Sequence, residues 1–118
     1  MKPTTLTVSA ASEATAATNW ITTDRFPEPT NISFGVTVAT AGASGYGNYT
    51  VQHTFINVPL LGTAAISAQD IFNHETIVAQ SAANDGNYAY PIAAIRCLLI
   101  GGSGNGDSAT ITVTQAGN

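Results

Sequence analysis

The two histidines, His53 and His74, are the side chains with the widest choice of chemistry in this chain. His74 lies near Asp70 and Glu75, and imidazole and carboxylate groups are the ligands that zinc accepts. A zinc site needs three or four converging ligands, and this spacing matches no zinc motif. His53 falls on the apolar side of an alternating segment. We therefore predict no metal site, with His53 a hydrogen-bonded histidine of the core or of an interface and His74 the anchor of a loop.

Arg96 is the next residue with a specific requirement. It interrupts the apolar segment 93–100, and an arginine that becomes buried there must be paired. Asp24 is the expected partner, which would staple the segment that begins at Trp20 to the segment that holds Arg96. A contact between subunits is the alternative, and catalysis is the least favoured of the three roles. Arg96, Asp24, His53 and Trp20 are thus structural or interface candidates.

No catalytic motif is present in the sequence. A nucleophile elbow, a dinucleotide fingerprint and telling pairs of carboxylates are missing, and the glycines of 101–106 lack the ending of a phosphate-binding loop. Charged residues make up only 8% of the chain, which leaves few acids, bases and ligands. The single cysteine, Cys97, lies among apolar residues, where burial would make it inert. We expect a protein that is not an enzyme and has no cofactor.

The charge of the chain bears on its partners. With three Lys and Arg residues and a net charge of -4, it lacks the basic stripe that nucleic acid or an anionic membrane surface would require. No apolar run approaches the roughly 18 residues that span a bilayer, and the N-terminus lacks the apolar stretch of a signal peptide. We expect neither nucleic acid nor a membrane as partner.

Alternation of apolar and polar residues predicts strands at 4–9, 20–24, 32–39, 49–55, 93–100 and 109–114. Glycine-rich segments separate 32–39 from 49–55 and 93–100 from 109–114, which favours two long antiparallel hairpins. Segment 93–100 is apolar on both faces apart from Arg96, as in a central strand covered on both sides.

Other segments are less regular. One helical turn is predicted at about 67–73 from the capping-box spacing, and a tight turn at Asp85-Gly86. Residues 10–19 are compatible with a helical turn, an extended arm or a surface loop. At 118 residues one core suffices. We predict an all-β domain, a compact antiparallel β-sandwich of immunoglobulin-like or jelly-roll type, with 1–19 as an N-terminal strand and arm and 20–118 as the remainder.

Several segments also resemble a known group of proteins. They are residues 20–25, 34–38, 49–55, 72–74, 91–96 and 110–115, of which Tyr-Thr-Val-Gln-His-Thr-Phe (49–55) and Ala-Ile-Arg (94–96) are the most specific. Over about residues 20–115 the chain resembles small structural proteins of tailed bacteriophages, of the kind that decorate or cement the capsid. The resemblance brings no catalytic residue.

This resemblance implies a non-enzymatic virion protein on the outer capsid surface, whose partners are the major capsid protein and copies of itself. A homotrimer would suit local threefold positions, with Arg96, His53 and the aromatic residues as contact candidates. The acidic balance suits the outer face of a shell, away from packaged DNA. A tail, connector or fibre subunit is one alternative. A carbohydrate-binding β-sandwich is another, with stacking platforms at Trp20, Tyr46, Tyr88 or Tyr90.

Overall fold

Strands dominate the regular structure, as the alternating pattern predicts. The structure, a computed structural model, describes residues 3–23, 31–40, 46–58, 65–102 and 106–115. Its strands are β1 (Thr4–Ala10), β2 (Thr15–Ala17), β3 (Ile21–Thr22), β4 (Ile32–Thr40), β5 (Asn48–Thr54), β6 (Ile71–Asn73), β7 (Asn84–Tyr88), β8 (Ala94–Ile100) and β9 (Asp107–Gln115). The 3₁₀-helix Ala68–Asp70 is short, and in these ranges no helix is long and apolar enough to cross a membrane.

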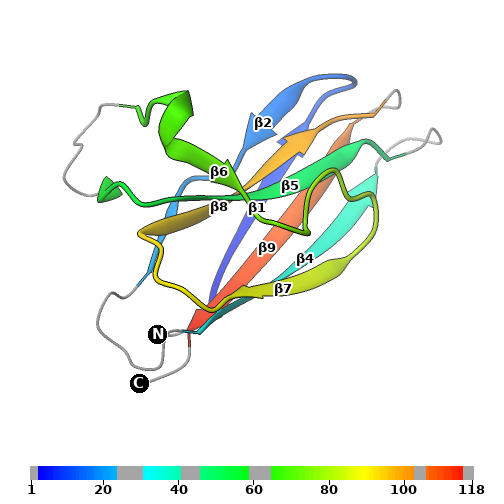
Figure 1. The fold of residues 1–118 in the computed structure, drawn as a ribbon. Coiled ribbons are helices and arrows are strands. Elements are labelled where there is room, and N and C mark those ends of the chain that lie inside the picture. The colour runs from blue at the N-terminus through cyan, green and yellow to red at the C-terminus, as the bar shows by residue number, and fades with distance from the viewer. Residues whose placement is uncertain (1–2, 24–30, 41–45, 59–64, 103–105, 116–118) are drawn as a thin grey trace.

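The strands form two antiparallel sheets that pack against each other (Figure 1). The first sheet has the order β1-β9-β4-β7. The second has the order β2-β8-β5-β6, and β3 pairs with another part of β8. The protein is therefore an all-β sandwich, which confirms the fold class predicted from the sequence.

The order of pairing identifies the type of sandwich. The first strand pairs with the last (β1 with β9), and the pairing continues inward through β2 and β3 with β8, β4 with β7, and β5 with β6. The chain is thus one long two-stranded ribbon whose successive parts alternate between the two sheets. The pair β4–β9 joins the two halves of the first sheet, and the pair β5–β8 joins those of the second. This wrapping is the jelly-roll arrangement and differs from the immunoglobulin strand order.

The core lies between the two sheets, where the apolar side of each alternating strand meets the other sheet. On β4 and β9 the fully buried side chains include Ile32, Val36, Ile111 and Val113. They face those of β5 and β8, which include Tyr49, Val51, Ile95, Cys97 and Leu99. Burying a large apolar side chain stabilises a fold by about 1.5–3 kcal/mol, so this layer is the main source of stability.

Strand β8 occupies the central position predicted for segment 93–100, between β2 and β3 on one side and β5 on the other. Its inner face is fully buried. The outer face is covered only in part, because Arg96 and Leu98 are half-buried and Ile100 is 39% exposed.

The two predicted hairpins are wrong. Strands β4 and β5 lie in different sheets, and so do β8 and β9. Strand β4 instead pairs with β9 along its whole length, from Ile32 opposite Gln115 to Thr40 opposite Asp107. The chain therefore crosses from one sheet to the other after β4 and again after β8, and we call these two places the crossings. Alternation shows that a segment has one buried face but not which strand it pairs with, and hairpin turns and crossings favour the same residues.

Asp107, at the start of β9, ties the two crossings together. Its Oδ2 atom accepts hydrogen bonds from the backbone N–H of Gly102 at 2.7 Å and of Gly47 at 2.8 Å. These donors, Gly102 first, lower the pKa of the Asp107 carboxyl. The sequence offered no role for this residue, because the residues that it joins are distant along the chain.

The glycines at the crossings are required by close backbone approach. A Cβ atom at Gly47 would lie 2.0 Å from the carbonyl oxygen of Ile100, and one at Gly101 would lie 2.2 Å from that of Ala11. A side chain at Gly47 would push the two crossings apart, and one at Gly101 would push the second crossing away from the segment that follows β1.

The remaining segments refine or correct the sequence predictions. Part of 10–19 is β2, an edge strand on β8 rather than a free arm. The helical turn is limited to Ala68–Asp70, and the Ser67 side chain makes no capping hydrogen bond. The tight turn predicted at Asp85-Gly86 is wrong, because both residues lie inside β7. Glycine suits position 86 of this strand, because a Cβ there would lie only 2.9 Å from Cζ of the Phe34 ring.

Candidate interaction surface

A cluster of aromatic rings lies where β5 and β7 end on the same side of the sandwich (Figure 1, left). It has a buried layer, in which each side chain is at most 7% exposed, and an exposed layer, in which each is at least 42% exposed. The buried rings are Phe34, His53, His74 and Tyr88; the exposed rings are Phe55, Phe72 and Tyr90.

The buried layer is held by a hydrogen bond between two of its rings. His53 Nδ1 and the Tyr88 hydroxyl are 2.8 Å apart, and the ring centroids are separated by 4.8 Å at an interplanar angle of 71°. Burial lowers the pKa of His53, with a further contribution from His74, and burial raises the pKa of Tyr88. Both groups are therefore neutral at pH 7, and the pair fixes the position of the rings above it.

His74 is anchored through both of its ring nitrogens. Its Nε2 atom donates to the carbonyl oxygen of Asn87 at 3.0 Å. Its Nδ1 atom accepts from the backbone N–H of Ile77 at 3.1 Å and of Thr76 at 3.2 Å. This arrangement ties the turn after β6 to β7 and leaves no lone pair for a metal. Within the described residues no group of three or more His, Cys, Asp or Glu side chains gathers to hold one.

The exposed layer forms one patch, which we call the aromatic patch: Phe55, Phe72 and Tyr90, which are 54%, 47% and 42% exposed. The Phe55 centroid lies 5.8 Å from that of Phe72 and 6.5 Å from that of Tyr90. Phe72 sits opposite His53 in the β5–β6 register and stacks on its ring at 5.8 Å. Contiguous exposed apolar side chains mark interaction sites, and aromatic residues are enriched at interface cores.

A polar row crosses the outer face of the second sheet. Arg96 on β8 donates through Nε to Gln52 Oε1 on β5 at 2.9 Å, and Gln52 Nε2 donates to Asn73 Oδ1 on β6 at 3.0 Å. The Arg96 guanidinium carbon lies 4.7 Å from the centroid of the Trp20 ring, within the range of a cation–π interaction. Burial lowers the pKa of Arg96, but the group remains charged.

The sequence predicted that Arg96 needs a partner and missed Gln52, its directly opposite neighbour on β5. The expected partner Asp24 lies outside the described residues. Two of the predicted structural or interface residues, Arg96 and Trp20, are in contact with each other on the outer face of the second sheet. His53 lies on the inner face and belongs to the aromatic cluster.

The four residues proposed as glycan platforms occupy different environments. Tyr88 is 1% exposed and cannot stack on a sugar. Tyr46 is half-buried against the core and donates through its hydroxyl to the Ser108 carbonyl at 2.6 Å. Trp20 is half-buried, with Arg96 over its ring. Of the four, Tyr90 has an exposed ring, beside a depression of about 390 Å³ that Glu75 and Asn87 also line.

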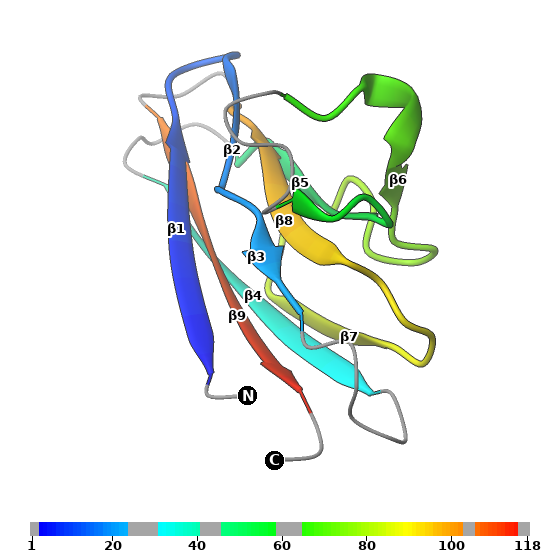
Figure 2. The ribbon, with the colours of Figure 1, turned by 90° about the vertical axis from the view of Figure 1, so that its left-hand side faces the viewer.

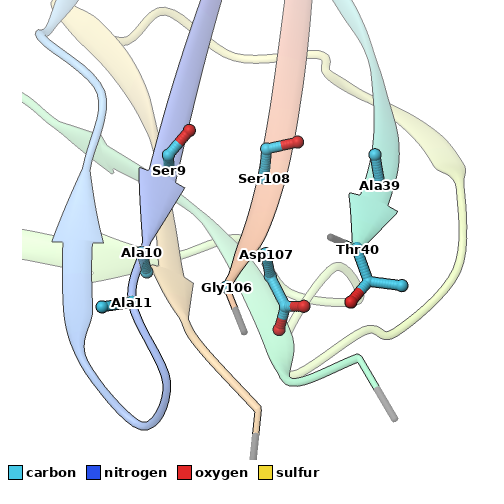
Figure 3. Close-up of a pocket in the computed structure, with 8 residues that line it drawn as sticks. All are labelled: Ser9, Ala10, Ala11, Ala39, Thr40, Gly106, Asp107 and Ser108. Atoms are coloured by element: carbon cyan, nitrogen blue, oxygen red, sulfur yellow. The ribbon is translucent and has the colours of Figure 1, made fainter. Parts of the chain in front are cut away.

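A depression of about 500 Å³ lies at the other end of the first sheet (Figure 3). Its lining is mostly small side chains, among them Ser9, Ala39 and Ser108. The acidic group of this lining is Asp107, whose Oδ2 atom is bound to the two glycine N–H groups of the crossings. The charged residue of this depression, Asp107, therefore has a structural role.

No family model matches the chain, and no curated protein matches it. Among solved structures it is similar to a chain of Bacillus endospore appendages, described as disulfide-linked pili, with a TM-score of 0.36 and 13% identity over 95% of this chain and 84% of that chain. It is also similar to a chain of infectious bursal disease virus, Gx strain, with a TM-score of 0.30 and 15% identity over 99% of this chain and 33% of that chain. Similarity at this level assigns no function.

Proposed function

We propose that the chain is a non-enzymatic structural protein of a virion, a capsid decoration or cement subunit that binds the outer surface of the assembled shell of major capsid proteins. The observation that carries this proposal is the aromatic patch, three exposed rings on a rigid buried layer. Because the His53–Tyr88 hydrogen bond and the Phe72–His53 stacking already hold the rings, little side-chain freedom is lost on docking. The sequence resemblance to phage decoration proteins supports the same role.

The outer face of the first sheet suits a tiled protein. On β1, β9 and β4 the outward side chains are all Thr, Ser, Gly or Ala. Hydroxyl pairs join Thr5 to Thr112 at 3.0 Å and Thr7 to Thr110 at 2.9 Å. This part of the face, formed by three of the four strands, carries no charge and is cheaper to desolvate against a neighbour than a charged surface. Many such weak contacts on a closed lattice act together.

We assign the aromatic patch to the contact with the major capsid protein. Copies of the chain assemble as a homotrimer on local threefold positions, with Arg96 among its contact candidates. His53 is only 4% exposed, so it supports Phe72 and Phe55 from below rather than touching a partner.

Sedimentation of virus particles tests the role. The chain, quantified by mass spectrometry, should travel with intact particles in numbers comparable to the major capsid protein. Low copy number would replace decoration by a tail, connector or fibre role. Recovery only as a small soluble species would overturn a virion role, and a glycan array would then test the carbohydrate-binding alternative.

Rebinding to particles that lack the chain tests the patch. Phe72→Ser should weaken binding at least tenfold, because a truncated aromatic anchor costs about 2 kcal/mol or more. Ile100→Ser is the matched control, since Ile100 is 39% exposed and lies on β8 away from the patch. Equal loss in both variants, or none in Phe72→Ser, would contradict the assignment. Circular dichroism confirms that both variants fold.

A further inference from the structure

The edges of the two sheets differ in how they are protected against pairing with another strand. Proteins protect edges with short strands, charges, irregular backbone or covering segments. In the described part of the chain, β2, β3 and β6 are only three, two and three residues long. Strand β7 is built from Asn-Asp-Gly-Asn-Tyr, which combines a charge with residues that disfavour strands.

Among the residues that the structure describes, strand β1 has none of these protections. It is seven residues long and pairs with β9 without a bulge, from Thr4 opposite Val113 to Ala10 opposite Asp107. It contains no charged residue, proline or glycine. On its other side β1 pairs with no described strand, and Figure 2 shows it at the outer side of the first sheet. Its outward backbone groups thus form a template for a further strand.

We propose that β1 of a second copy of this chain occupies this edge, antiparallel, with a two-fold axis through Thr7. Thr7 is the midpoint of Thr4–Ala10, so all seven residues find partners: Leu6 lies opposite Val8 of the second copy, and Thr5 opposite Ser9. The two four-stranded sheets then become one continuous sheet of eight strands.

The side chains of β1 are suited to pair with those of β1 in a second copy, because none of them is charged. On the inner face Leu6, which is half-buried in the single chain, gains cover from Val8 of the second copy. On the outer face the pairs are Thr with Ser and Thr with Thr, the kind of hydroxyl pairing that β1 already makes with β9 at Thr5–Thr112 and Thr7–Thr110. A two-fold axis sets Thr7 opposite itself, where a charge would repel its copy, and β1 carries none.

This contact does not depend on the virion role. The β1 edge and the aromatic patch lie on opposite sides of the sandwich, since β1 is at one end of the strand order and β6 and β7 are at the other. One subunit can therefore hold a partner through the patch and a second copy through β1. In a shell, the β1 contact would link neighbouring trimers.

Cysteine cross-linking of the purified chain tests the contact and its register. Directly opposite residues in antiparallel strands have Cα atoms about 4.5–5.5 Å apart, within the range of a disulfide. Thr7→Cys should therefore form a disulfide-linked dimer on mild oxidation. Thr37→Cys, on the same face of the sheet but on central β4, should not. The native Cys97 does not compete, because it is fully buried.

Register is tested with two further variants. Thr5→Cys alone should form no disulfide-linked dimer, because the two copies of residue 5 would be about 14 Å apart along the strands. Thr5→Cys mixed with Ser9→Cys should cross-link. Disulfide-linked dimers in every variant, Thr37→Cys included, would indicate random collision and would overturn the proposal. Failure of Thr7→Cys to cross-link would also overturn it.

Charge introduction gives an independent readout by sedimentation velocity. The wild-type chain should form a dimer or an even multiple. Thr7→Lys should raise the dissociation constant of this contact at least tenfold, because two lysines face each other. Thr37→Lys should not. Mixing Thr7→Lys with Thr7→Asp should restore pairing between the two variants, and failure to restore it, or a wild type without even multiples, would refute the β1 contact.

Discussion

Gly47→Ala is the most direct test of the way the two sheets are connected. In a hairpin turn this substitution would meet little but solvent. In the structure the new Cβ would lie 2.0 Å from Ile100 O, 2.6 Å from Gly102 N and 2.7 Å from Gly101 C, all of them backbone atoms. None of these atoms can swing away as a flexible side chain can. The two crossings must separate, and the hydrogen bond from Gly47 to Asp107 is then lost as well.

The size of the effect follows from the overlap. Overpacking costs typically about 1–3 kcal/mol, occasionally more, and backbone contacts at these distances belong at the upper end. For a chain of 118 residues, 1 kcal/mol corresponds to a change of about 4 °C in Tm. We expect Gly47→Ala to lower the free energy of unfolding by about 3 kcal/mol or more and Tm by about 12 °C or more.

Gly35→Ala is the matched control, since a Cβ at Gly35 in the middle of β4 has nothing within 4 Å. Reduced freedom of the unfolded chain should stabilise this variant by about 0.4–1 kcal/mol, which raises Tm by about 2–4 °C. Differential scanning calorimetry and urea titration measure both. Gly47→Ala with a Tm within about 4 °C of the wild type would refute the close approach of the crossings.

Three further outcomes follow from the buried groups. Tyr88→Phe leaves the buried Nδ1 of His53 without its partner, so urea titration should show a free energy of unfolding that is lower by about 1–3 kcal/mol. The double variant with His53→Leu should recover part of this loss, because no polar atom then remains at the site. The lowered pKa of His53 means that the unfolded chain binds more protons below about pH 6.5, so stability should be full above that pH and fall as the pH drops through the folded-state pKa. His53→Leu should flatten this dependence, and an unchanged slope between pH 7.5 and pH 5 would contradict it. Burial raises the pKa of Cys97 to about 12, so a thiol reagent should label the native protein far more slowly than the urea-unfolded protein; equal rates would show that the site is open.

Only part of the candidate interaction surface could be predicted from the sequence. His53 could be placed on an apolar strand face because alternation is local, and its hydrogen-bond partner, Tyr88, lies 35 residues further along the chain. The aromatic patch joins one residue that directly follows β5, one from β6 and one that follows β7. Arg96 visibly needed a partner, but only the β5–β8 register sets Gln52 opposite it.

Alternation in the sequence is enough to place the main strands and to identify a buried face, because a side-chain period of two is a property of the local chain. Segments such as β4, with Ile32, Phe34 and Val36 inward, follow from that pattern alone. Which strands pair became known from the fold alone. A glycine-rich segment permits a hairpin or a crossing equally well, and the choice depends on contacts between residues far apart in the chain. Here β4 pairs with β9 and β5 with β8, and the Asp107 carboxylate and the close approach of Gly47 to Ile100 hold the crossings of this jelly roll together.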